Sequence, residues 1–222
     1  KIGNKLSTLN SSGKGSNTVR YYDGADPDDI WAVKSAGIDP SNGKELFYAK
    51  DGSYTYDFSY DDEVICGNTR PDVEGVIGTS LNWKGFSVSL NFRYQMGADV
   101  FNEALYSKVE NISRSDLNKN QDKRALYERW QEVGDIVRFK DIASAETTPM
   151  SSRFVQEENV LTLESLYLGY EFYNGWIEKL GLSSLKLQFS MRDVFRASTI
   201  RSERGIAYPF ARSMEAGLSF NF

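Results

Sequence analysis

The sequence predicts an all-β protein, an antiparallel β-barrel whose strands cross a membrane. Three observations predict it: several segments alternate apolar and polar residues, the connections between them are short at one end and long at the other, and aromatic residues gather at the short-turn end. A barrel strand presents an apolar side chain to lipid only at every second position, so the overall composition stays polar. Hydrophobic residues make up only 40% of the 222 residues, which fits that pattern.

Five segments carry the strand alternation. The clearest is residues 86–96, where six apolar residues share one face and polar residues occupy the other. Its length is close to the ~9–11 residues that a tilted strand needs to cross a bilayer. The other segments are residues 73–83, 166–172, 185–191 and 213–222. All five are therefore expected to be transmembrane strands, with their polar faces toward a wet lumen.

The connections differ at the two ends of these strands. Lys84-Gly85 forms a tight turn, and residues 173–184 read as one short helical turn that ends at Gly181. The long connections are residues 97–159, residues 196–212 and most of residues 7–72. In bacterial outer-membrane barrels the short turns are periplasmic and the long loops extracellular. Trp83, Phe86, Tyr173 and Trp176 lie at the short-turn end, as an interfacial aromatic girdle requires.

The long loops are expected to have some order of their own. Residues 44–49 and 53–60 predict a β-hairpin with a type I′ turn at Asp51-Gly52. Residues 124–132 have a helical composition. Residues 7–17 are rich in Ser, Gly and Asn, which predicts a flexible extracellular tip.

Composition excludes several classes of function. The net charge of −5 argues against a nucleic-acid partner, because phosphate binding needs a basic face. The chain has no histidine and one cysteine, which excludes His-based catalytic triads, an intrachain disulfide and a Cys-rich metal site. We therefore expect no enzyme activity and no cofactor. Asp26, Asp28 and Asp29 are a weak calcium candidate, and a solvated loop is the favoured interpretation.

Several phrases together resemble the C-terminal part of SusC/RagA-type TonB-dependent outer-membrane transporters of Bacteroidetes. They are residues 29–47 (DIWAVKSAGIDPSNGKELF), 67–71 (GNTRP), 163–169 (LESLYLG), 180–187 (LGLSSLKL), 192–195 (RDVF) and 208–213 (YPFARS). They span almost the whole chain in the family's order. Two places depart from the family pattern: Gly75 and Gly78 are spread apart where the family has a Gly-Gly pair, and Arg192-Asp193 stands where Gln-Asn is common.

The resemblance implies more than the residues show by themselves. It implies that residues 1–222 are the C-terminal part of a 22-stranded barrel, whose plug, TonB box and earlier strands are absent from this chain. It implies TonB-driven import of glycan or peptide oligomers, with a SusD-like lipoprotein as lid. The expected partners are the rest of the barrel and plug, that lipoprotein, the TonB complex, outer-membrane lipid and the substrate. The expected location is the outer membrane. We expect the chain to be a fragment or a processed product, since Lys1 opens no secretory signal.

Two groups of residues are candidate sites. Leu218, Phe220 and Phe222 are expected to belong to the signal that the barrel-assembly machinery recognises, so deletion of Phe222 should impair insertion. Trp31, Tyr48 and Tyr167 are candidates for contact with the ligand or the lid; for the loop residues, packing of the loop on itself is the alternative.

Two other functions are compatible with alternating strands. The first is a soluble, secreted β-sandwich that binds carbohydrate through exposed aromatic residues. The second is a small self-closing barrel that acts as an adhesin or structural protein, which five clear strands do not favour because eight is the usual minimum.

Overall fold

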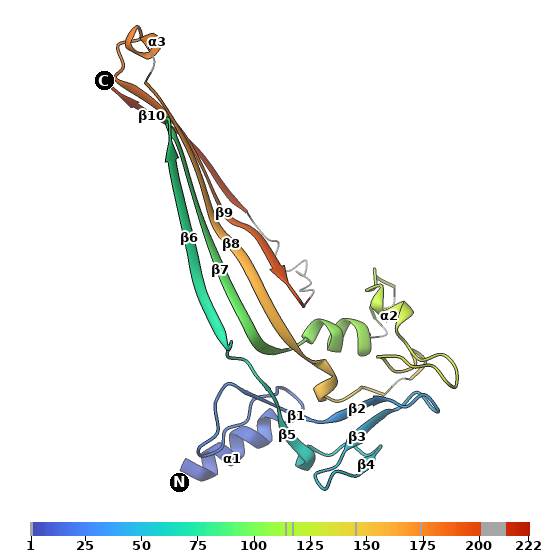
Figure 1. The fold of residues 1–222 in the computed structure, drawn as a ribbon. Coiled ribbons are helices and arrows are strands. Elements are labelled where there is room, and N and C mark those ends of the chain that lie inside the picture. Colours follow the sequence, from blue (N-terminus) through green and yellow to red (C-terminus); the bar gives the residue numbers. More distant parts are fainter. Residues whose placement is uncertain (1, 114, 117, 145, 174, 201–211) are drawn as a thin grey trace. The chain divides into compact units, whose positions relative to one another are not determined.

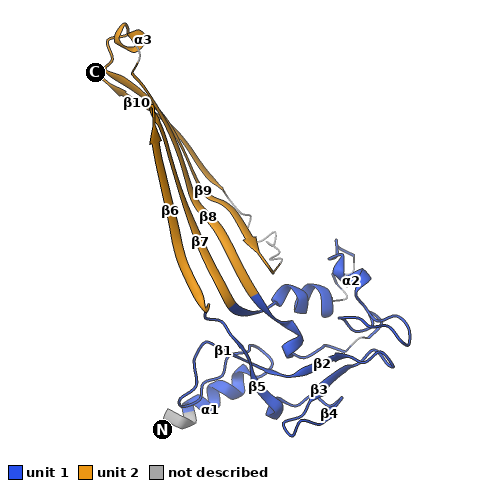
Figure 2. Ribbon diagram, in the orientation of Figure 1, with its two compact units in different colours: residues 1–70, 98–157 blue, residues 71–97, 158–222 orange. Residues whose placement is uncertain are grey.

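The structure is a computed structural model that describes all residues except 1, 114, 117, 145, 174 and 201–211. The chain divides into two compact units (Figure 2). Unit 1 comprises residues 1–70 and 98–157, and unit 2 comprises residues 71–97 and 158–222. The phrase at residues 208–213 that contributed to the family resemblance, and the loop at residues 196–212, lie largely outside the described residues.

Unit 2 is built on a five-stranded antiparallel sheet with the order β10-β9-β8-β7-β6 (Figure 1). The strands are β6 (Val73–Trp83), β7 (Phe86–Phe101), β8 (Val155–Phe172), β9 (Ser184–Ser198) and β10 (Ser213–Asn221). Each of the five predicted strands is present. Three of them, β7, β8 and β9, extend further than the apolar alternation indicated.

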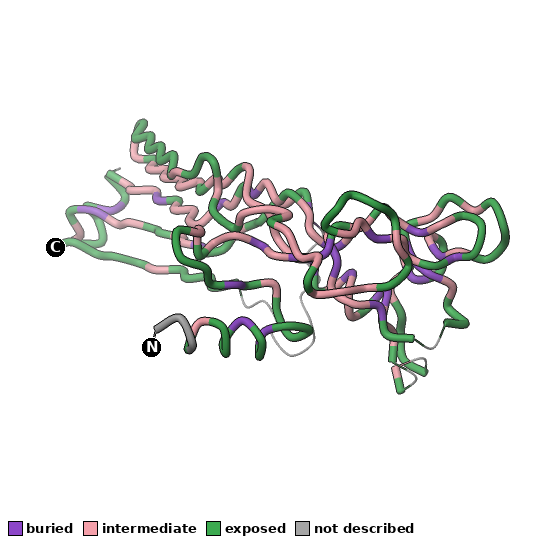
Figure 3. Tube along the Cα trace, turned by 90° about the horizontal axis from the view of Figure 1, so that it is seen from below, coloured by how far each residue is buried: buried purple, intermediate pink, exposed green. Residues whose placement is uncertain are grey.

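The register of the sheet places the apolar residues of all five strands on one face. Ile77 lies opposite Phe92, and Leu168 lies opposite Phe189. On the other side of β9, Leu218 lies opposite Leu187. Within the described chain this face has no cover: Ile77 is 60% exposed and Leu218 is 59% exposed. Figure 3 shows the strands of unit 2 as mainly exposed or intermediate.

The opposite face of the sheet carries polar side chains that bond to one another. Asn91 Nδ2 donates to Ser165 Oγ at 2.8 Å, and Asn221 Nδ2 donates to Ser184 Oγ at 2.8 Å. Arg93 pairs with Glu164 between neighbouring strands. These contacts cross between strands, so they fix the register that the alternation requires.

The short connections of unit 2 are those predicted. Lys84 and Gly85 have φ values of 46° and 88°, the left-handed conformation of a two-residue hairpin turn. The β8–β9 connection contains α3 (Gly175–Glu178), and the helical turn is followed by Gly181, with φ of 75°. Both connections lie at the same end of the sheet, because the Glu171 amide donates to the Gly85 carbonyl at 2.9 Å. No helix in the described part of the chain is long and apolar enough to cross a membrane.

Unit 1 holds two smaller sheets and several short helices. One sheet pairs β1 (Asp29–Val33) with β5 (Glu63–Asn68), and the other has the order β2-β3-β4. The other elements are α1 (Ile2–Gly13), β2 (Ser35–Ile38), β3 (Glu45–Tyr48), β4 (Tyr54–Thr55), η1 (Tyr60–Asp62), η2 (Leu105–Glu110, a π-helix), α2 (Arg124–Tyr127) and η3 (Ser152–Phe154). One apolar core cluster of this unit consists of Leu105, Val109, Ala125, Phe139 and Phe154.

Three predictions for the loops need correction. Residues 7–17 are not a flexible tip, because α1 covers most of them and Asn10 bonds to both the amide and the carbonyl of Tyr21. The hairpin between β3 and β4 does not have a type I′ turn. Asp51 keeps a negative φ and accepts the amide of Ser53 at 2.9 Å, so Gly52 alone, with φ of 86°, turns the chain in a three-residue loop.

The helix predicted at residues 124–132 is present only in part. It ends after Tyr127, and Arg129 then forms a bridge with Phe139. The side chain of Arg129 is buried and donates to backbone carbonyls, including that of Lys140 at 3.0 Å. These tertiary bonds hold the chain in an extended conformation where the local composition favours a helix.

Candidate functional site

The first candidate surface is the aromatic end of the sheet in unit 2. Phe86 packs on Tyr170 with a centroid distance of 4.3 Å, and Phe172 packs on Trp176 at 5.8 Å. Trp83 follows in the same band, because it pairs with Phe86 across the turn. Trp83, Phe86, Tyr173 and Trp176 are all about half exposed. The structure thus collects the four predicted girdle residues at one end of the sheet, and their role at a membrane interface stays a prediction.

The second candidate surface is the apolar face of β10. Leu218 and Phe220 lie opposite Leu187 and Leu185 of β9, and both remain more than half exposed. Phe222 follows the strand and is also exposed. Their proposed role as an assembly signal stays a prediction.

The three candidates for ligand or lid contact are divided between the two units. Trp31 lies in β1, where its ring packs on Tyr22 at 4.9 Å and its Nε1 is buried without an acceptor among the described residues. Tyr48 lies in β3 and stacks on Tyr54 at 4.9 Å. Tyr167 lies in β8, in the other unit. These three residues therefore do not form one site within either unit.

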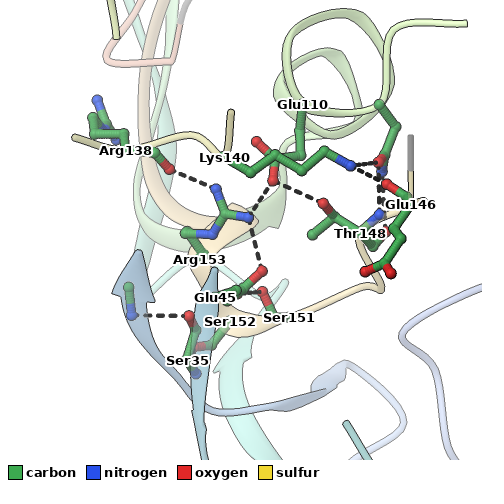
Figure 4. A network of polar contacts seen from close by, with 12 residues as sticks. Ser35, Glu45, Glu110, Arg138, Lys140, Glu146, Thr148, Ser151, Ser152 and Arg153 are labelled. Atoms are coloured by element: carbon green, nitrogen blue, oxygen red, sulfur yellow. Dashed lines mark hydrogen bonds and ion pairs between the residues drawn. The ribbon is translucent and has the colours of Figure 1, made fainter. Parts of the chain in front are cut away.

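A network of buried charges in unit 1 was not predicted (Figure 4). Arg153 contacts Glu45 at 2.8 Å and Glu110 at 2.6 Å, and the side chains of all three residues are at most 10% exposed. Thr148 Oγ1 donates to Glu110 at 2.8 Å, and Ser151 Oγ donates to Glu45 at 2.5 Å. The network therefore ties β3, the π-helix η2 and the segment before β8 into one unit.

The charges of this network shift the pKa values of its cations. Burial disfavours the charge on Arg153, but the hydrogen bonds and attraction of Glu45 and Glu110 outweigh it and raise the pKa of its guanidinium above the ordinary value. Burial lowers the pKa of Lys140 and of Arg129, with only partial compensation from Glu110. Arg153 is thus a fully compensated cation, whereas Lys140 and Arg129 are not.

The segment at residues 39–43, one of the phrases that carried the family resemblance, forms a compact loop between β2 and β3. Asp39 accepts the amide of Ser41 at 2.8 Å and the hydroxyl of Tyr56. Gly43 has φ of 70°, and a Cβ there would lie 2.6 Å from the ring of Trp130. Trp130 Nε1 in turn donates to the Pro40 carbonyl at 3.1 Å. Glycine is therefore required here both for the backbone conformation and for the approach of the indole ring.

The acidic residues proposed as a weak calcium candidate bond to protein groups. Arg70 pairs with Asp28 at 2.9 Å and with Asp26 at 3.4 Å, and Asn68 Nδ2 donates to Asp29 at 3.0 Å. Within the described ranges no three His, Cys, Asp or Glu residues are grouped as a metal site would need. The weak calcium candidate stays a prediction.

Little in the sequence indicates the buried network, because its members come from three distant segments. Glu45 and Arg153 are 108 positions apart in the sequence, and Glu110 and Arg153 are 43 positions apart. The one local signal is the pair of apolar residues that precede Glu110 within η2, Leu105 and Val109, which are both buried. A charged residue that follows two buried apolar residues of the same helix is a candidate for burial.

Comparisons with known proteins complete the description. No family model matches this chain. TonB-dependent receptor P39 of Formosa agariphila is 25% identical over 171 residues, which is 75% of this chain and 16% of that receptor. TonB-dependent receptor P3 of the same organism is 25% identical over 169 residues, again with 16% of its length covered. The chain thus spans about a sixth of the length of these curated relatives.

Solved structures show the same likeness in fold. The RagAB peptide importer in its open-open state matches 87% of this chain and 22% of the compared chain, with a TM-score of 0.69 and 21% identity. The importer in its closed-closed state matches 87% of this chain and 23% of the compared chain, with a TM-score of 0.68 and 22% identity. The mainly antiparallel β fold of this chain is therefore that of one part of these transporters. Sequence and fold together confirm that the chain resembles part of a SusC/RagA-type TonB-dependent transporter.

Proposed function

We propose that this chain forms part of the wall and of the extracellular loops of a TonB-dependent outer-membrane importer of nutrients. The observation that carries the proposal is the uncovered apolar face of the five-stranded sheet. That face runs across all five strands, from Ile77 in β6 to Leu218 in β10. Apolar area left in water costs about 25 cal/mol per Å². An apolar face that runs across five strands is therefore expected to contact lipid or another apolar surface. Lipid is the cover that strict alternation and a hydrogen-bonded polar reverse face favour.

The open edges of the sheet support the same proposal. Strands β6 and β10 each pair with one neighbour in the described chain. In a bilayer an unpaired strand edge is not tolerated, because no water is available to satisfy its backbone groups. We therefore propose that further strands complete the barrel on both sides. The family resemblance gives 22 strands as the total.

The proposed substrate and partners rest on the family resemblance and on the similar solved structures. The similar solved structures are of the RagAB peptide importer, so peptides are one proposed substrate class, with glycan oligomers as the other. A SusD-like lipoprotein is the proposed lid, and the TonB complex is the proposed energy source. The proposed contacts with ligand or lid remain Trp31 and Tyr48 in unit 1, and Tyr167 on the polar face of β8.

The remaining proposed roles concern the membrane. The aromatic end of the sheet (Trp83, Phe86, Tyr173 and Trp176) is proposed to lie at the periplasmic interface, where amphipathic rings are favoured. The apolar face of β10 with Phe222 is proposed to be recognised during barrel assembly. The soluble β-sandwich, our alternative, is not favoured, because a second sheet would bury residues such as Ile77 and Leu218 that are exposed here.

The experiment is a fractionation followed by mass spectrometry. The chain is isolated from membranes in detergent, and the intact masses of all co-purifying proteins are measured under denaturing conditions. The proposal predicts that extraction needs detergent and that a polypeptide with plug and further strands co-purifies together with a lipoprotein. A lone 25.1 kDa species that stays in solution without detergent would contradict it.

A further inference from the structure

The apolar face of unit 2 carries a groove of about 400 Å³ near the aromatic end of the sheet. The groove crosses three neighbouring strands and is lined by residues 86–88 of β7, 168–170 of β8 and 187–189 of β9. These are the three inner strands of the five-stranded sheet. The groove is therefore complete within the described part of this chain, whatever pairs with the outer edges of β6 and β10.

The walls of the groove are apolar side chains, and its floor is backbone. The wall residues are the first and third of each triplet: Phe86, Val88, Leu168, Tyr170, Leu187 and Phe189. The middle residues, Ser87, Gly169 and Gln188, belong to the opposite face because successive residues of a strand alternate, so they contribute backbone atoms whose polar groups are paired in the sheet. At the end nearest the short turns, Phe86 and Tyr170 pack ring against ring at 4.3 Å. The groove therefore suits a hydrocarbon ligand and not a polar one.

The packing of the groove favours a lipid chain as its occupant. Phe86, Leu168 and Leu187 are 53%, 41% and 43% exposed, so their contacts are still available. A gap beside these walls would forfeit van der Waals attraction. Because lipid chains are as apolar as these side chains, the gain in a bilayer comes from close packing and not from the hydrophobic effect. The groove starts at the aromatic end, which is the level where the acyl chains of a bilayer begin.

An uncompensated cation stands at the same end of the sheet. Lys84, in the β6–β7 turn, is exposed, and its Nζ lies 5.1 Å from the centre of the Trp83 ring. No carboxylate of the described residues pairs with it. Glu171, whose amide bonds to the same turn, belongs to the polar face, while Glu178 and Lys179 of the neighbouring connection offset each other in charge. The two short connections therefore carry one excess positive charge, at the level of the lipid headgroups.

We propose that this groove binds an acyl chain of an anionic phospholipid, whose phosphate lies at Lys84. The chain supplies the packing contacts with the walls, and the headgroup supplies the negative charge that the turn lacks. An anionic headgroup fits better than a zwitterionic one, because the latter brings its own cation. The site rests on the proposed function, since only a sheet in a bilayer meets such a lipid. It makes one part of the lipid-facing surface selective.

The test is photo-crosslinking in the native assembly, reconstituted in phosphatidylcholine vesicles. The probe is a phosphatidylglycerol with a diazirine on its acyl chain, and mass spectrometry of peptides maps the labelled residues. As the mole fraction of the probe rises, labelling of residues 86–88, 168–170 and 187–189 should saturate. Labelling around Ile77, which is on the same face but outside the groove, should rise in proportion to the probe. Unlabelled phosphatidylglycerol should displace the probe from the groove about fivefold more effectively than added phosphatidylcholine.

Variants separate the groove from its surroundings. Leu187→Trp and Val88→Phe fill it from different strands, and each should reduce the saturable labelling at least fivefold. Ile77→Trp, on the same face, is the matched control and should leave that labelling unchanged. Lys84→Gln should remove the preference for phosphatidylglycerol, whereas Lys44→Gln, at an exposed lysine of unit 1, should preserve it. Labelling around Ile77 reports in the groove variants whether the sheet still inserts.

The outcomes distinguish this proposal from the function on which it rests. Labelling that rises in proportion to the probe both in the groove and around Ile77 would overturn the groove proposal and leave the lipid-facing sheet intact. A groove without label beside a labelled Ile77 would do the same, because another protein would then occupy it. Saturable labelling that survives both groove variants, or a headgroup preference that survives Lys84→Gln, would also overturn it. An apolar face without label anywhere would contradict the proposed function itself.

Discussion

The two units place their apolar and polar side chains in opposite ways. Unit 2 turns its apolar side chains outward and bonds its polar side chains to one another across the sheet. Unit 1 buries an apolar core together with the charges of Glu45, Glu110 and Arg153. The stability of unit 2 is therefore expected to depend on its surroundings, and that of unit 1 on its own internal contacts. Variants within one unit therefore test each of these two expectations separately.

The largest expected effect comes from the centre of the buried network. Arg153→Met leaves Glu45 and Glu110 buried without their common counter-ion, which should destabilise unit 1 by about 3–5 kcal/mol. Hydrogen exchange should show lost protection in residues 105–113 and 146–154, with the sheet of unit 2 unchanged. Arg70→Met removes an ion pair at the surface and is the matched control, expected to have little effect. Equal effects of the two variants would contradict the distinction.

The next effect tests the apolar face of the sheet. Ile77→Arg places a charge at the middle of β6 on the face proposed to contact lipid, which should cost about 2–4 kcal/mol if this position is near the bilayer midplane. Ser80→Arg places the same charge on the polar face of the same strand and is expected to cost far less. Folding into detergent or lipid, followed by urea unfolding, measures both. In a soluble protein Ile77→Arg would instead be tolerated, because that residue is already 60% exposed.

The strands of unit 2 could be predicted from the sequence, whereas the buried network of unit 1 could not. Alternation of period two identified every strand of unit 2, since each residue's face follows directly from its position in the chain. The Lys84-Gly85 turn was equally local. The network around Arg153 depends on three segments that meet only in the folded chain, so neither the strand alternation nor the turn residues indicated it. The helix α1 was missed because composition suggested flexibility, whereas the contacts of Asn10 with Tyr21 supply order from outside the segment.

A smaller effect tests the loop that packs on Trp130. Gly43→Ala adds a Cβ that would lie 2.6 Å from the indole ring, at a residue with φ of 70°. The expected cost is about 2–4 kcal/mol, from about 1–2 for the left-handed backbone and the rest from displacement of the ring. Gly24→Ala separates the two causes, because Gly24 has φ of 80° but no neighbour within 4 Å. Unit 1 unfolding, monitored by Trp fluorescence, should show a clearly larger loss for Gly43→Ala; equal losses would exclude a role for the contact.

The smallest effect concerns the pH dependence of the same loop. The hydroxyl of Tyr56 donates to Asp39 and holds the pKa of that carboxyl below its ordinary value. A carboxyl whose pKa is lowered on folding stabilises the protein at pH values above the pKa of the unfolded chain, and this contribution is lost as the pH falls through the lower, folded value. Tyr56→Phe should therefore raise the pKa of Asp39 toward its ordinary range in an NMR titration. Tyr54→Phe, which removes a hydroxyl bonded to Tyr48 instead, should leave Asp39 unchanged.

The central claim is that the apolar face of the sheet in unit 2 contacts lipid. Spin labels at successive residues of β7 from position 86 to position 96, in a Cys66→Ser background reconstituted in lipid vesicles, test it directly. If this face contacts lipid, accessibility to oxygen, which partitions into lipid, peaks at even positions such as Leu90. Accessibility to a water-soluble nickel reagent should peak at odd positions such as Asn91. Loss of this period of two, with the even positions either buried from both reagents or open to the water-soluble one, would contradict the claim.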